Sequence, residues 1–175
     1  MTDVSLLLVE VLQNSSSAKA KRIDVELVCE QDYVKFIVTD DGTGIDNDKL
    51  LLLNDGKFLS SNGRGNGLKL LKEKTDLYSG EFLISSKVGA GTKLSACFKR
   101  VPNLILGDIS ASLVAYICSE FELSFSYVAG GRVFSFSTGE LYARYRDRLF
   151  YPEVLRQIRN EILENIDKIN GGLTI

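Results

Sequence analysis

Two polar side chains, Glu10 and Asn14, stand on a largely apolar segment near the start of the chain. Residues 3–20 are predicted to form a buried helix, apolar almost all round, on which positions four apart share a face. A carboxylate can polarise a water, and an amide oxygen can bind Mg²⁺, so the pair suits phosphoryl transfer. The alternative is a helix end at which both side chains are simply solvated.

A second candidate site follows the strand predicted over residues 33–39, in the run Asp40-Asp41-Gly42-Thr43-Gly44-Ile45. A carboxylate at the end of a core strand can accept a hydrogen bond from a purine amino group. The two glycines after it would let the backbone come close to a flat ring. Taken alone, the run is also ordinary turn chemistry, because Asp before Gly favours turns.

Glycines gather again in the run Gly63-Arg64-Gly65-Asn66-Gly67-Leu68-Lys69, where a helix is predicted to begin. Free backbone N–H groups and the positive end of the helix dipole favour anion binding there, and Arg64 and Lys69 add positive charge. The alternative is a flexible loop with a glycine hinge. The run is neither a Walker A motif nor a Rossmann fingerprint. A fourth run, Gly89-Ala90-Gly91-Thr92, is by itself only a hairpin turn.

In this order and at these spacings, the four runs resemble the motifs of the GHKL or Bergerat-fold ATPases. This family includes DNA gyrase, the Hsp90 chaperones, sensor histidine kinases and MutL. The resemblance covers about residues 3–100 and implies ATP and Mg²⁺ as cofactors. The N box is matched by Glu10-Val11-Leu12-Gln13-Asn14, and the glycine boxes by Asp40-x-Gly42-x-Gly44, Gly65-Asn66-Gly67-Leu68 and Gly91-Thr92.

The resemblance also implies a role for each candidate residue. Glu10 would be the catalytic base, Asn14 would hold Mg²⁺ and Asp40 would bind the adenine amino group. The other implied nucleotide-binding residues lie in or beside the glycine boxes and are Gly42, Gly44, Ile45, Gly65, Asn66, Gly67, Leu68 and Thr92. The resemblance places Gly44 beneath the adenine ring and the second glycine box around the phosphates.

Hydrophobic periodicity predicts the elements that would position these residues. The predicted helices span residues 3–20, 47–53, 67–78, 108–121 and 152–169, and the predicted strands span residues 22–28, 33–39, 81–86, 93–99, 123–128 and 132–137. This order predicts an α+β fold, a two-layer sandwich with a mixed sheet and helices on one face, followed by a small αββα extension. Pro102-Asn103 interrupts the pattern, which predicts a boundary between residues 1–101 and 102–175.

The whole chain is also similar to a group of small stand-alone bacterial ATP-binding proteins. In that group, the ATPase domain is followed by a Leu-Gly-Asp segment and a short αββα tail. The segment is matched here by Leu106-Gly107-Asp108.

The composition excludes several classes of function. A net charge of −2 over 175 residues argues against a general nucleic-acid binder, whose affinity would come from a basic surface. The sequence contains no His and therefore offers no His triad and no phosphoacceptor His of its own. Three widely spaced cysteines predict neither a zinc site nor a disulfide framework. No apolar run is long enough to span a bilayer, so we expect a cytoplasmic protein without a membrane partner.

Two functions stay open at this point. The first is a Mg²⁺-dependent ATP-binding protein of the histidine kinase-like type, which hydrolyses ATP or transfers its γ-phosphate to a partner protein. The alternative is a nucleotide-sensing interaction module without significant turnover. Both imply a protein partner or an acceptor on another chain, and a homodimer interface on the tail stays open as well.

Overall fold

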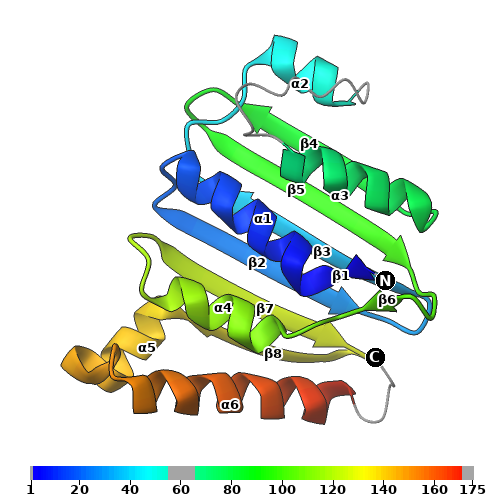
Figure 1. Cartoon of the computed structure of the whole chain (residues 1–175). Helices are drawn as coiled ribbons and strands as arrows, with labels where there is room; N and C mark the ends of the chain where they lie inside the picture. The colour runs from blue at the N-terminus through cyan, green and yellow to red at the C-terminus, as the bar shows by residue number, and fades with distance from the viewer. Residues whose placement is uncertain (1, 55–65, 171–175) are drawn as a thin grey trace.

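The computed structural model describes residues 2–54 and 66–170 of the chain. Six strands form one mixed sheet (Figure 1). In sheet order they are β4 (Glu81–Lys87), β5 (Gly91–Lys99), β3 (Tyr33–Asp40), β2 (Arg22–Cys29), β7 (Glu122–Ala129) and β8 (Arg132–Ser137). A short parallel pair, β1 (Thr2–Asp3) and β6 (Leu104–Ile105), lies outside this sheet.

The sheet has one buried and one open face because its strands alternate apolar and polar residues. In β2, Ile23, Val25 and Leu27 are buried, whereas Asp24 and Glu26 are exposed. The register sets Val25 opposite Val38 of antiparallel β3 and opposite Phe125 of parallel β7. Apolar residues of neighbouring strands therefore share the buried face.

Helices cover the buried face of the sheet. The described helices are α1 (Val4–Ser17), α2 (Asn47–Asn54), α3 (Asn66–Leu77), α4 (Ile109–Ile117), α5 (Thr138–Tyr145) and α6 (Pro152–Asn170), with a 3₁₀ turn at Arg146–Arg148. Figure 1 shows α1, α3 and α4 lying side by side across the sheet. This arrangement confirms the predicted two-layer α/β sandwich. Among the helices within the described ranges, none combines the length and apolarity that a membrane crossing requires.

Helix α1 lies over the middle of the sheet and carries two of the candidate residues. The Asp3 side chain caps its first turn by accepting hydrogen bonds from the backbone N–H groups of Ser5 and Leu6, at 2.9 and 3.4 Å. The expectation that this helix is buried on every side is wrong. Leu6 is 63% exposed because the sheet and the neighbouring helices cover only part of the helix surface.

The C-terminal part of the chain extends the same sheet. Strand β7 pairs with β2 in parallel over seven residue pairs, from Arg22 and Glu122 to Val28 and Val128. The domain boundary between residues 101 and 102 stays a prediction. Buried residues from both sides of it belong to one hydrophobic core.

The predicted αββα tail contains one further helix, α5, between β8 and α6. A capping box between Ser137 and Glu140 starts this helix directly after β8. The same Ser-x-x-Glu spacing is present in the sequence and could have revealed the helix.

Asp108 joins the tail helices and should contribute measurably to stability. Its carboxylate caps α4 by accepting from Ala111 N–H at 2.8 Å and pairs with Arg159 of α6. The pKa of the Asp108 carboxyl group is lowered to about 2. The largest cause is the hydrogen bond from the Ser110 side chain, followed by the bond from Ala111 N–H and the interaction with Arg159. Because the side chain is 48% exposed, we expect Asp108→Ala to lower the free energy of unfolding by only about 1 kcal/mol.

The pH dependence of this effect follows from the lowered pKa. A carboxyl group whose pKa is lowered in the folded state stabilises the fold at pH values above its ordinary pKa of 3.8. This contribution is lost as the pH falls towards about 2. Thermal unfolding at neutral pH should therefore show a Tm that is about 2–4 °C lower in Asp108→Ala. The difference should shrink between pH 4 and pH 2, and a constant difference would contradict this role.

Candidate functional site

A cavity of about 190 Å³ lies between the C-terminal half of α1, the start of α3 and the ends of β3, β4 and β5. Six of the predicted nucleotide-binding residues line it: Asn14, Asp40, Gly44, Ile45, Leu68 and Thr92. Its other walls are mainly apolar and include Val11, Val38, Ile84 and Leu94. An apolar slot with a few convergent polar groups is typical of a small-molecule site.

A larger hollow of about 580 Å³ lies on the opposite, open face of the sheet. It is lined by strand residues that point away from the core, such as Asp24, Glu26 and Ser126, and by none of the candidate residues. We therefore take the smaller cavity as the candidate site.

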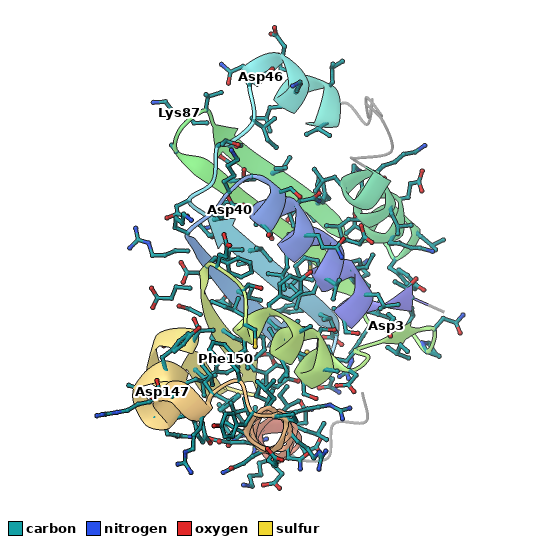
Figure 2. The ribbon with its side chains drawn as sticks, turned by 60° about the vertical axis from the view of Figure 1, so that its left-hand side comes forward. Asp3, Asp40, Asp46, Lys87, Asp147 and Phe150 are labelled. Carbon is teal, nitrogen blue, oxygen red and sulfur yellow. The ribbon has the colours of Figure 1, made fainter. Side chains whose placement is uncertain are left out.

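Asp40 is the buried acid of this cavity. Only 9% of the residue is exposed, and it lies at the end of β3 near the C-terminal end of α1 (Figure 2). Its Oδ2 accepts a hydrogen bond of 2.7 Å from Ser15 Oγ, and its Oδ1 accepts one of 2.9 Å from Gly42 N–H. Each oxygen keeps a lone pair for another donor.

Ser15 was missed by the sequence analysis, although the sequence holds a signal for it. The buried residues of α1 recur at the helical period, and Ser15 continues the stripe of Leu8 and Leu12. A hydroxyl on an apolar stripe requires a hydrogen-bond partner. The 25-residue separation from Asp40 hid that partner from the sequence.

Asp41, the second acid of the run, has a structural role. Its Oδ1 accepts hydrogen bonds from the backbone N–H groups of Lys21 and Arg22, at 2.7 and 2.8 Å. These bonds, led by that from Arg22, lower the pKa of its carboxyl group. Asp41 therefore fixes the start of β2, and Asp40 alone faces the cavity.

The first and third glycine boxes are held together beside the cavity. Gly44 has a φ of +70°, and a Cβ there would lie 2.1 Å from the Lys87 carbonyl oxygen, so only glycine fits. Ile45 N–H donates to Ser86 Oγ at 2.8 Å, and this hydroxyl lies 2.9 Å from Thr92 Oγ1. Ser86 was not among the candidates, because one serine in a predicted strand carries no sequence signal.

Glu10 and Asn14 meet the start of α3 at the other side of the cavity. A Cβ on Gly67 would lie 2.8 Å from Glu10 Oε2 and 3.6 Å from Asn14 Nδ2. The Asn14 Nδ2 atom is buried and has no hydrogen-bond partner among the described residues. Asn66 begins α3, while Gly65 lies outside the described residues.

Gly67→Ala tests whether the position of Glu10 matters for turnover. The added methyl group must displace the flexible Glu10 carboxylate, whereas alanine is at least as good a helix former as glycine. We expect ATP turnover to fall about 10- to 100-fold without a loss of Tm. Gly139→Ala in α5 is the matched control, since its Cβ would meet only Glu122 and Ser137. Equal turnover in both variants would contradict this prediction.

Residues 2–102 match the sequence profile of the family described as "Histidine kinase-, DNA gyrase B-, and HSP90-like ATPase". The match covers more than half of the chain and includes all the candidate residues. The chain belongs to this family. The predicted resemblance is confirmed, and with it the assignment of a nucleotide-binding ATPase domain. The roles of single residues towards the nucleotide stay predictions.

Two curated proteins of Bacillus subtilis (strain 168) are similar to this member of the family. A "Probable C4-dicarboxylate sensor kinase" is 30% identical over 104 residues, which are 55% of this chain and 19% of that protein. The "Sensor histidine kinase YxdK" is 33% identical over 89 residues, which are 47% of this chain and 27% of that protein. The chain thus spans only a fifth to about a quarter of the length of these relatives.

Two solved structures are also similar to the chain. The mycobacterial sensor histidine kinase MprB shares 22% identity and a TM-score of 0.41, over 53% of this chain and 67% of that one. The Aquifex aeolicus MutL ATPase domain complexed with ADP shares 17% identity and a TM-score of 0.48, over 76% of this chain and 62% of that one. Neither likeness bears on the role of a particular residue.

Proposed function

We propose that the chain binds ATP with Mg²⁺ in the Asp40 cavity and that Glu10 promotes transfer of the γ-phosphate to water or to a hydroxyl group of a partner. The observation that carries the proposal is the arrangement around the cavity. A buried acid with spare acceptor capacity lies at one side. A carboxylate and an amide whose Nδ2 has no partner among the described residues lie at the other, beside the start of α3.

The Asp40 side supports recognition of adenine. The 6-amino group of adenine is a donor, and the Asp40 carboxylate can accept from it while it keeps its bonds to Ser15 and Gly42. The apolar walls provided by residues such as Val38 and Leu94 suit the faces of a flat ring. We assign Thr92 the remaining adenine hydrogen bonds and Gly44 the contact beneath the ring.

The opposite side suits Mg²⁺. Asn14 is partly buried, and its amide oxygen is a ligand type that Mg²⁺ accepts, while its unpartnered Nδ2 is a donor that suits a phosphate oxygen. No group of three or more acidic, Cys or His side chains is placed to hold a metal within residues 2–54 and 66–170. We therefore assign Asn14 as the protein ligand, with nucleotide phosphates and water completing the set. The bound ion would neutralise charge that develops on the transferred phosphoryl group.

Glu10 is the group that can accept a proton. It lies one helical turn before Asn14, and its carboxylate contacts the start of α3 near Gly67. From there, Glu10 would take the proton of the attacking water or hydroxyl as the bond to the γ-phosphorus forms. The N–H groups at the start of α3 are available to the phosphates.

The destination of the phosphate stays open between water and a protein acceptor. Both Bacillus subtilis relatives are named as sensor kinases, which favours a protein acceptor. The 175 residues contain no His, so a His acceptor would lie outside them. If ATP binds without turnover, the alternative of a nucleotide-sensing interaction module takes precedence.

Following the γ-phosphate of labelled ATP tests the proposed function. We expect the label to leave ATP in the presence of Mg²⁺ and to leave it much more slowly in an Asp40→Asn sample, which should bind ATP more weakly. Label released as free phosphate would identify an ATPase, and label on protein would identify a kinase whose acceptor can be mapped. Label that stays on bound ATP would contradict turnover and favour the sensing module.

A further inference from the structure

Helix α4 of the tail contacts α1 at the turn that carries Glu10 and Asn14. The Tyr116 hydroxyl donates a hydrogen bond of 3.3 Å to the Val9 carbonyl oxygen, 107 residues earlier in the chain. The Gln13 side chain lies beside this hydroxyl and lowers its pKa. Tyr116 thus contacts both ends of one turn of α1.

This turn sets the orientation of the two site residues. Val9 immediately precedes Glu10, and Gln13 immediately precedes Asn14. Successive helix residues are rotated by about 100°, so Val9 and Gln13 share one face while Glu10 and Asn14 share the next. A contact that holds the first face therefore fixes the direction of the second.

The position of Tyr116 is itself well defined. Ile109, Leu113 and Ile117 anchor α4 in the core, and the Asp108 cap fixes the start of the helix. The Tyr116 ring also packs against Phe121, with ring centroids 5.9 Å apart. The tail therefore presents the hydroxyl to α1 from a rigid support.

The charge of Glu10 also acts on the Tyr116 hydroxyl. Burial raises the pKa of Tyr116 above its ordinary value, the nearby Gln13 side chain lowers it, and the Glu10 charge raises it. The Tyr116 hydroxyl, with its proton committed to the Val9 carbonyl, is therefore a neutral neighbour of the Glu10 carboxylate.

We propose that Tyr116 is a positioning residue, through which the tail holds the Val9–Asn14 turn so that Glu10 and Asn14 face the nucleotide site. The proposal rests on the function proposed above and extends it to a part of the chain outside the four family motifs. It gives residues 102–175 a role in turnover.

Tyr116→Phe tests this role, because it removes the hydroxyl and keeps the ring. Tyr78→Phe is the matched control, since the Tyr78 hydroxyl also donates to a backbone carbonyl at 3.3 Å, that of Asn103, away from the site. We expect Tyr116→Phe to lower kcat by about tenfold with KM for ATP within about twofold. The control should retain wild-type values, and both variants should have similar Tm values.

Amide hydrogen exchange gives a second readout that does not need turnover. The amides of residues 9–14 should exchange several-fold faster in Tyr116→Phe than in Tyr78→Phe or the wild type. Unchanged kcat, or unchanged exchange in this turn, would overturn the positioning role. If the wild type binds ATP without turnover, the proposed catalysis fails, and exchange alone decides whether Tyr116 holds the turn.

Discussion

Asp40→Asn should weaken ATP binding about 10- to 150-fold. The change removes the negative charge and replaces one acceptor oxygen by an amide donor, which opposes the adenine amino group. A hydrogen bond to a charged group contributes about 1.5–3 kcal/mol, and this range sets the expected loss of affinity. Isothermal titration of the full chain with ATP and Mg²⁺ measures it.

The neighbouring Asp41→Asn provides a matched control for this titration. Asp41 differs from Asp40 by one position and carries the same charge, yet it bonds to the backbone of Lys21 and Arg22. We expect its ATP affinity to stay within about twofold of the wild type, because it has no contact with the cavity. Equal losses in both variants would show that general charge, and not adenine recognition, explains the effect.

Glu10→Gln should separate turnover from binding. The amide keeps the size of the side chain but cannot accept a proton, and general base catalysis typically contributes about 10²- to 10⁴-fold. We expect kcat to fall by that factor, while the Kd for ATP stays within a few-fold. Steady-state phosphate release and a binding titration on the same sample measure the two quantities.

Glu73→Gln is the control for the loss of a carboxylate near the site. Glu73 lies on α3 with an exposed side chain and pairs at 3.9 Å with Lys69, on the same helix as Gly67. Its replacement should leave both kcat and Kd unchanged. A Glu10→Gln protein with wild-type turnover would remove Glu10 from the proposed mechanism.

Local sequence patterns predicted most of the secondary structure because their periodicities were clear. The strand predicted over residues 22–28 and the helix predicted over residues 108–121 reappear in the structure as β2 and α4. The sequence did not show that β7 lies parallel to β2, because a pairing across 100 residues leaves no local signal. The sequence also did not show that Leu6 is exposed. Apolar residues lie all round this helix, so their pattern does not indicate which side faces solvent.

The candidate site could be predicted in outline but not in its supporting contacts. The glycine runs and Asp40 were recognisable because backbone geometry and chemistry demand particular residue types there. Ser15 and Ser86 were missed, since each acts through a partner distant in sequence. Tyr116 was missed for the same reason, as its contact with α1 exists only once the tail has folded onto the sheet.

A comparison of ATP with inosine triphosphate tests whether Asp40 recognises the adenine amino group. The two nucleotides differ only along one edge of the base, where inosine carries an oxygen in place of the 6-amino group and a hydrogen on N1. A site built to accept this hydrogen bond should bind ATP at least about tenfold more tightly in the wild type. The preference should disappear in Asp40→Asn. Equal wild-type affinities for the two nucleotides, or no binding of ATP, would contradict the assignment.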